Sequence, residues 1–439
     1  MPVRRTFITG AAVVAATTFA GVVAHADPAP SAAPKDVIQA IADGQAILDV
    51  RARYEDVDQA NLAPLGQAFT TRVQAGWQTS PYDGFQALVE VAGLFHADDG
   101  HYNIAVPGGA SLNGRTQYPI IDDPAFFTLN RAQLSWSPDK LLKLTVGRQR
   151  ILIDDQRFVG NVGWRQDEQR FDAARADIDL GRLTATYVYV WRVDRIFGGQ
   201  LDWNSDSHLL NVAYQVAPPL KVEGFLYALD FSNAQPTTLA NPRLSGGLTA
   251  GARANGHGPI GPLTLGYDLT WARETSYRGQ TPPYGLDFWQ GDVSATLGIA
   301  TARVDYEQLD GNGAQGFTTP IGTTHNFQGW ADAFAADGGN KTEVDGIRDT
   351  NVSLQLSPPW KAPLLSHLQA IVRYYDFHAQ LTGAYLANEW DAQVQAEITK
   401  GLTAQVTYAE FVRAASVPTG TVAAPPSRTK IWLTLEYKL

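Results

Sequence analysis

Hydrophobic and polar residues alternate with a period of two along most of this chain, in segments of about ten residues. In the segment 429–439, for example, Leu433 and Leu435 share one phase, whereas Thr434 and Glu436 share the other. Because successive side chains of a β-strand point to opposite faces, each segment predicts a strand with one apolar and one polar face. Repeated segments of this kind, separated by turns, are typical of a transmembrane β-barrel whose outer face contacts lipid.

The alternation therefore predicts an all-β protein, a single transmembrane antiparallel β-barrel of about 18 strands. An even number returns the chain to the side of the membrane on which it starts. The predicted strands are 47–55, 69–78, 85–95, 130–136, 141–149, 171–180, 183–193, 207–216, 221–230, 247–255, 263–273, 286–297, 300–309, 349–356, 367–378, 389–398, 402–411 and 429–439.

The connections between these segments alternate between short and long. Only Ser137–Lys140 separates two of the strands, the next connection runs from Arg150 to about Arg170, and the one after that is little more than Gly181. Outer-membrane barrels have short periplasmic turns and longer external loops, whereas a soluble sandwich has no reason for such an alternation. We therefore expect the cell outer membrane as the location, with its lipid and lipopolysaccharide as neighbours and both termini periplasmic.

The N-terminal part of the chain fits export from the cytoplasm. Arg4 and Arg5 precede an apolar stretch, which ends in small residues and in Ala24-His25-Ala26, an A-x-A cleavage signal. We expect residues 1–26 to be a signal peptide and residues 27–46 a periplasmic linker with a short helix. Residues 47–439 then form the barrel. Beyond residue 26 no apolar run approaches the ~18 residues of a transmembrane helix.

Composition narrows the function classes. The chain has no cysteine and its formal net charge is −10, which becomes −12 (32 − 44) without Arg4 and Arg5. Such an acidic protein offers no basic face for nucleic acid. Arginine (25) greatly outnumbers lysine (9). The excess favours fixed bidentate pairing with carboxylates, or recognition of oxyanions.

Many arginines fall on the polar phase of their strands. Because a charge on the lipid face costs roughly 2–4 kcal/mol near the membrane centre, we expect these side chains to line the lumen. A ring of arginines in a pore can select anions. Alternatively the arginines pair with lumenal acids such as Asp305, Glu307 and Glu389 and only brace the wall, and the phase leaves both possibilities open. The polar-phase arginines proposed as substrate-channel residues are Arg53, Arg72, Arg131, Arg175, Arg192, Arg303 and Arg373.

Catalysis and metal binding find little support in the motifs. The chain has no Gly-x-Ser-x-Gly elbow, His-Glu-x-x-His or P-loop. The acidic turns 98–100, 310–313 and 337–340 lack the full spacing of a calcium loop, so we interpret them as solvated turns. We expect no enzyme activity, no catalytic residue, no cofactor and no metal.

Two stretches resemble the alginate export family of outer-membrane barrels. The first starts at Gly147-Arg148-Gln149 and continues through Arg157-Phe158-Val159-Gly160, Gly163-Trp164-Arg165-Gln166 and Phe171-Asp172-Ala173. The second is His325-Asn326-Phe327-Gln328-Gly329-Trp330-Ala331-Asp332-Ala333-Phe334. The resemblance implies an eighteen-stranded barrel whose long extracellular loops are partly folded into the lumen, and which passes an acidic polysaccharide to the exterior.

The resemblance also implies roles for individual residues. Arg148, Arg157 and Arg165 become candidates for contact with a polyanion. Trp164 and Trp330 become candidates for packing an infolded loop. Asp172 and Asp332 become candidates for tethering partners of those arginines. The remaining motif residues that we expect to pack the loops are Gly147, Gln149, Phe158, Gly160, Gln166, His325, Phe327 and Gly329.

Two functions of different kinds follow. The first is passive export of an anionic, alginate-like polysaccharide through an arginine-lined lumen, with possible export partners in the periplasm. The second is a general diffusion or uptake porin for small anionic or neutral solutes, which a lumen of mixed charge favours. Fold alone does not decide between them.

Overall fold

The computed structural model describes residues 33–105, 110–234, 246–278, 283–334, 344–359, 361–362 and 365–439. The expected signal peptide and residues 27–32 of the expected linker therefore lie outside the described residues. The expected short helix is present as α1 (Val37–Ala42), which the Asp36 carboxylate caps by accepting from Gln39 N. In the described part of the chain, no helix combines the length and the hydropathy needed to cross a membrane.

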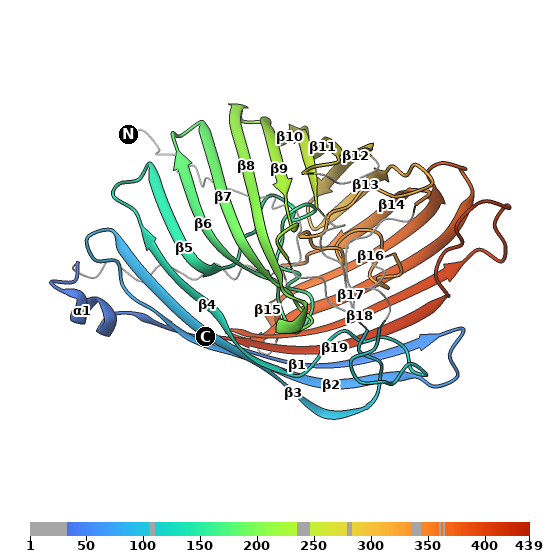
Figure 1. Ribbon diagram of the computed structural model, residues 1–439, viewed down its shortest axis with the longest axis horizontal. Helices are drawn as coiled ribbons and strands as arrows, with labels where there is room; N and C mark the ends of the chain where they lie inside the picture. The colour runs from blue at the N-terminus through green and yellow to red at the C-terminus, as the bar shows by residue number, and fades with distance from the viewer. Residues whose placement is uncertain are drawn as a thin grey trace, which may run out of the picture.

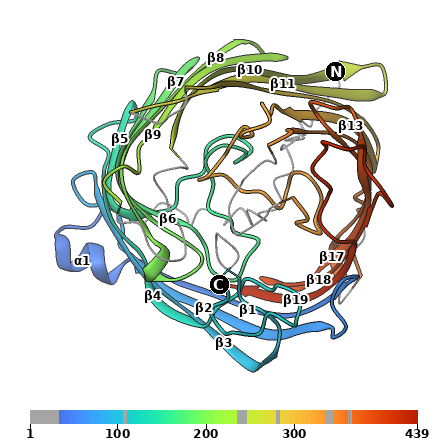
Figure 2. The ribbon, with the colours of Figure 1, turned by 45° about the vertical axis from the view of Figure 1, so that its right-hand side comes forward.

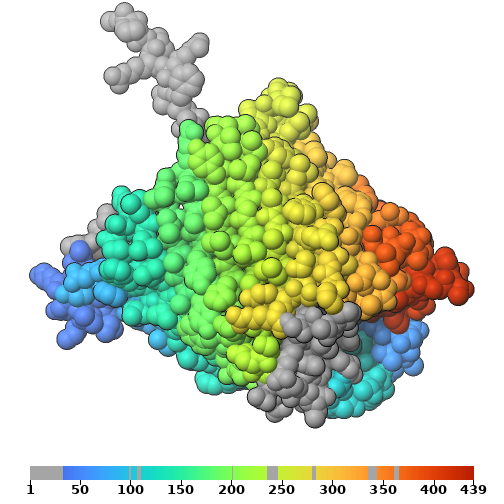
Figure 3. Space-filling model, turned by 45° about the horizontal axis from the view of Figure 1, so that its top comes forward, coloured from blue at the N-terminus to red at the C-terminus, as the bar shows by residue number. Residues whose placement is uncertain are grey.

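The described strands form one antiparallel sheet that closes on itself (Figures 1 and 2). Apart from β14 and β15, strands that follow one another in the sequence pair, and β1 also pairs with β19, which closes the ring. β14 pairs directly with β16, and the two-residue β15 pairs only with β16, so 18 of the 19 described strands form the wall. Figure 3 shows part of this wall from outside as one surface in chain order. This closed barrel confirms the predicted fold.

Every predicted strand coincides with an observed one. The largest differences are at β3 and β10, which extend beyond their predicted ends to His101 and Ile260. The strands are β1 Gln45–Gln59, β2 Gly66–Gln78, β3 Phe85–His101, β4 Phe126–Trp136, β5 Leu142–Gln149, β6 Arg170–Asp179, β7 Leu183–Asp194, β8 Trp203–Ala217, β9 Leu220–Leu229, β10 Gly247–Ile260, β11 Leu263–Thr275, β12 Gly285–Leu297, β13 Ala300–Leu309, β14 Ile347–Leu356, β15 Lys361–Ala362, β16 Leu365–Ala379, β17 Tyr385–Thr399, β18 Leu402–Arg413 and β19 Arg428–Lys438.

The two faces of the wall have opposite chemistry. Leu134, Val304 and Val406 are about half exposed on the outside, whereas Glu55 and Glu389 are buried on the inside. This distribution of apolar and charged side chains is the inverse of that in a soluble protein. A closed barrel satisfies all of its backbone hydrogen bonds internally, so an apolar outer face is stable in a lipid bilayer.

A β-bulge between β3 and β4 changes the direction of one side chain. Glu90 pairs with Arg131 and Val91 with Leu129, which leaves Asn130 as the extra residue of β4. A bulge places two residues of one strand opposite one residue of its neighbour. Asn130 and Arg131 consequently both donate to Glu90, with N–O distances of 2.6–2.9 Å.

Two connections run inside the ring of strands rather than over its rim (Figure 2). We call residues 150–169, between β5 and β6, the first inner loop, and residues 310–334, after β13, the second inner loop. They are joined by a parallel bridge between Val159 and Ile321, and Gly160 N donates to Ile321 O at 2.9 Å. The main hydrophobic core lies where these loops pack against the wall, and it includes Phe317 of the second inner loop.

Candidate functional site

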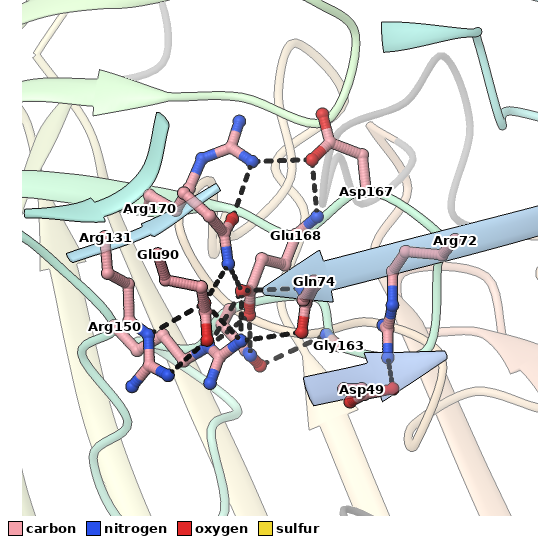
Figure 4. A network of polar contacts seen from close by, with 12 residues as sticks. Asp49, Arg72, Gln74, Glu90, Arg131, Arg150, Gly163, Asp167, Glu168 and Arg170 are labelled. Carbon is pink, nitrogen blue, oxygen red and sulfur yellow. Dashed lines mark hydrogen bonds and ion pairs between the residues drawn. The ribbon is translucent and has the colours of Figure 1, made fainter. Parts of the chain in front are cut away.

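The two inner loops narrow the lumen, so the candidate site is the constriction that they form with the wall. The first inner loop is attached to β2, β3 and β4 by a buried polar network (Figure 4). Glu168 accepts from Arg150 at 2.5 Å, from Asn130 at 2.6 Å and from Gln74 at 3.2 Å. The Arg150 guanidinium also lies 3.4 Å from Glu90. These contacts fix the loop to one side of the barrel.

A second attachment lies on the opposite side, at β13. The Arg157 guanidinium donates to both oxygens of Glu307, at 2.7 and 2.9 Å, and each of these residues is only 2% exposed. Arg157 also donates to Thr319 Oγ1, and Glu307 accepts from Gln328 Nε2 at 3.2 Å. Since Thr319 and Gln328 belong to the second inner loop, this ion pair links both loops to the wall.

The two loops also meet through an aromatic and ionic cluster. The Trp164 ring stacks on His325 with 3.9 Å between ring centroids, and Arg53 donates to Trp164 O at 2.7 Å. Asp332 accepts from Arg165 at 3.1 Å and lies 3.0 Å from His325 Nδ1.

The charge states in this cluster follow from burial and from neighbouring charges. Burial lowers the pKa of His325 to about 4, so its ring is neutral near pH 7. Burial acts to raise the pKa of Asp332, but the hydrogen bond with His325 and the charges of Lys430 and Arg165 outweigh it and hold that pKa below its usual range. Asp332 is therefore an ionised carboxylate that ties loop and wall together.

The second inner loop is attached to β17 through its backbone. Trp330 N donates to Asp391 at 3.2 Å and Ala331 N donates to Glu389 at 2.6 Å. Gly329 has a φ of +86°, and a Cβ atom at this position would collide with the Glu389 carboxylate. Only glycine provides both the left-handed backbone conformation and the close approach that these hydrogen bonds need.

Most of the arginines proposed as channel residues are paired with carboxylates. Arg303 has only a loose partner, Asp292 at 3.7 Å. Arg53 and Arg373 have no carboxylate within ion-pair distance in the described part of the chain, and Arg373 donates to Tyr375 Oη at 2.7 Å. The paired arginines and their partners are Arg72 with Asp49, Arg131 with Glu90, Arg148 with Asp172, Arg157 with Glu307, Arg165 with Asp332, Arg175 with Asp177 and Arg192 with Asp202.

Arg148 differs from the other arginines in its position. It follows the outward phase of the exposed Leu144 and Val146, close to the end of β5. Its guanidinium pairs with Asp172 at 2.8 Å and with Asp194 at 2.5 Å. Arg148 therefore lies near the loop end of β5, and its ion pairs join β5 to β6 and β7.

The remaining residues of the family motifs pack the two inner loops. Phe158 lies between Phe225 and Phe288, and Phe327 lies under the Arg157 guanidinium at 4.9 Å. Three more residues fix the backbone around the first inner loop: Gln149 donates to Ala173 O, Gln166 donates to Thr70 Oγ1, and Gly147 has a φ of +113°. Gly160 has no room for a Cβ atom beside Thr323.

Among the described residues, at least two cavities lie beside the inner loops, and the sequence pattern did not indicate either of them. One of about 60 Å³ lies halfway along the β10–β16 wall and is lined by Asp292, Arg303, Asp305, Asp349 and Arg373, among other residues. The other, of about 310 Å³, lies on the side of the long loops, and we call it the vestibule. Its cationic lining residues are Arg165, Arg195, Arg428 and Lys430.

Comparisons with known proteins support the fold. No protein-family model and no curated protein sequence matches the chain. Solved structures do match, among them OpdK of Pseudomonas aeruginosa, crystallised with vanillate, at 14% identity and a TM-score of 0.65 over 91% of this chain and 99% of that one. OccAB4 of Acinetobacter baumannii matches at 14% identity and a TM-score of 0.66, over 90% of this chain and 98% of that one.

These neighbours are outer-membrane porins with 18-strand barrels. At such low identity the similarity establishes a shared barrel fold, and the porins that share it are channels rather than enzymes. The comparisons lend no support to the alginate export family in particular.

Proposed function

We propose that this protein is a passive channel of the outer membrane through which small solutes diffuse. The observation that carries the proposal is the pair of inner loops, which are fixed to the wall by buried ion pairs and narrow an 18-strand lumen. The larger cavity beside the loops measures about 310 Å³, which is at the lower end of the range for pockets that bind small molecules. The shared fold with porins supports the same reading.

Export of an anionic polysaccharide is the second candidate, and it rests on the sequence motifs that resemble the alginate export family. The paired state of most candidate arginines weighs against it, because a guanidinium that already binds a carboxylate is a poor site for a further anion. OpdK, which shares the barrel fold, was crystallised with vanillate, a small organic compound. By analogy, we propose small organic solutes, anionic or neutral, as the class transported here.

The proposed orientation can be tested by single-cysteine labelling, since the chain has no cysteine of its own. Thr419 lies in the long connection before β19, and Lys140 lies in the short turn between β4 and β5. Both are exposed. In intact cells, a membrane-impermeant maleimide should label Thr419→Cys and leave Lys140→Cys unlabelled until the outer membrane is permeabilised. The opposite pattern would invert the proposed orientation.

The lumenal charges can be tested by ion selectivity in planar bilayers. Arg303 faces the mid-barrel cavity and is only loosely paired, so Arg303→Gln removes one positive charge from confined water. At about 6–8 Å a unit charge acts with roughly 0.5–0.7 kcal/mol even in water, so cation permeability should rise and anion permeability should fall, each about two- to threefold. Lys140→Gln on the exposed turn is the matched control. An unchanged reversal potential for Arg303→Gln would exclude Arg303 from the permeation path.

A further inference from the structure

Cationic side chains outnumber carboxylates in the lining of the vestibule. Arg165, which lines it, is 8% exposed, and its Nη1 lies 3.7 Å from Glu55 Oε2, beyond hydrogen-bond distance, with no other acceptor among the described residues. Nε1 of Trp164, which also lines the vestibule, has no acceptor among those residues either. Buried donors without acceptors are costly, and a bound acceptor would remove that cost.

Two cations of the last strand add to this excess. Arg428 has no carboxylate within ion-pair distance in the described part of the chain, and it donates only a long hydrogen bond of 3.5 Å to Pro426 O. Lys430 is 3% exposed, and its Nζ lies 3.6 Å from Asp332 and 4.0 Å from Glu55, beyond hydrogen-bond distance of both. Neither cation is neutralised by a short ion pair.

The balance of charge among the side chains that line the vestibule is positive. Four cationic side chains line it, whereas the lining carboxylates are Asp122 and Asp332. Asp332 is already shared between Arg165, Lys430 and His325. Burial raises the pKa of Asp122 to about 7, so this group carries less than a full negative charge near neutral pH.

The rest of the lining is mixed: Ile120, Ile196 and Pro426 are among its apolar residues, and Gln59, Asn61, Gln169 and Thr324 are among its polar ones. A volume of about 310 Å³ is at the lower end of the range for pockets that bind small molecules. A compact apolar body with one anionic head would fit both the size and the chemistry of this space.

We propose that the vestibule is a binding site for a small organic oxyanion, a carboxylate or a phosphate monoester, whose head is held by Arg428, Lys430 and Arg165. The proposal rests on the channel function proposed above, and it adds a capture step at the constriction. The elements that line the vestibule lie at the end of the barrel that carries the long connections, and both inner loops contribute to the lining. A solute that enters from that end therefore meets this site where it meets the inner loops.

The test is current block of the full-length protein in planar bilayers, with benzoate, phenyl phosphate or the neutral isostere benzamide added on the long-loop side. Benzoate or phenyl phosphate should block in a saturable way and benzamide should not. Arg428→Gln should raise the half-blocking concentration about tenfold, the usual effect of losing a charge-assisted hydrogen bond, and Lys430→Gln should act in the same direction. Arg413→Gln, an exposed arginine at the same end of the barrel, is the matched control and should leave block unchanged.

The proposal is overturned if benzamide blocks as well as benzoate does, or if Arg428→Gln binds benzoate like the wild type. Because Arg428 is not paired with a carboxylate, Arg428→Gln leaves no buried negative charge without a partner. This variant should therefore fold even if Lys430→Gln does not. Calorimetric titration of benzoate into the detergent-solubilised protein separates this inference from the proposed function. Binding without conductance would refute the channel and leave the site, whereas conductance without binding would refute the site and leave the channel.

Discussion

Replacing Arg157 with glutamine should release the first inner loop from the barrel wall and raise both the conductance and the current noise of the channel. The Arg157–Glu307 pair is buried on both sides and makes two hydrogen bonds of 2.7 and 2.9 Å. Removing one partner leaves the other charge buried alone, which costs about 3–5 kcal/mol. Single-channel recordings would detect the wider path, and urea unfolding in detergent would detect the loss of stability.

A double variant provides the control for this result. In Arg157→Gln/Glu307→Gln no charge remains buried without a partner, so most of the lost stability should return. The conductance should fall back toward the wild-type value as the loop docks again. The ion pair does not hold the constriction in place if Arg157→Gln alone behaves as the wild type does. The same conclusion follows if the effects of the two substitutions on stability and conductance simply add.

Gly329→Ala should detach the second inner loop from β17. The new Cβ atom would collide with the Glu389 carboxylate, and the φ of +86° would strain any residue with a side chain. The backbone strain costs about 1–2 kcal/mol and the overpacking about 1–3 kcal/mol. Both act on a segment whose docking rests on hydrogen bonds from Trp330 N and Ala331 N. The expected result is a lower unfolding temperature and a larger conductance.

A substitution at Gly420 separates the cost of backbone strain from the cost of the collision with Glu389. It has a similar φ of +88°, and a Cβ atom there would meet nothing within 4 Å. Gly420→Ala should therefore lose only about 1–2 kcal/mol and keep the wild-type conductance. Equal effects of the two substitutions on conductance would mean that contact with Glu389 does not position the second inner loop.

The sequence was sufficient to predict the barrel because lipid on one face and water on the other impose a period of two on every strand. The period shows whether a side chain points inward or outward, but it cannot show which residue that side chain pairs with. Arg131 and Arg303 share the inward phase, yet Arg131 is locked in a bidentate pair with Glu90 while Arg303 lies 3.7 Å from Asp292. The partner depends on register and on bulges, which the period does not encode.

Two features could not be predicted from local sequence at all. The bulge at Asn130 interrupts the alternation by one residue, and its cause is tertiary, because the extra side chain bonds both Glu90 and Glu168. The vestibule is built from connections that are far apart in the chain, together with Arg428 and Lys430 at the start of β19. Only the closed barrel brings these residues together, so no motif marks them.

The central claim is that two interlocked inner loops make this barrel a channel for small solutes. Liposome swelling with the intact protein tests it most directly, by comparing a monomeric uronate with a uronate hexamer of the same chemistry. We predict rapid swelling with the monomer and none above the rate of protein-free liposomes with the hexamer. Equal entry of the hexamer would contradict the account, because a lumen narrowed by loops fixed at Glu307 and Glu389 could not pass it.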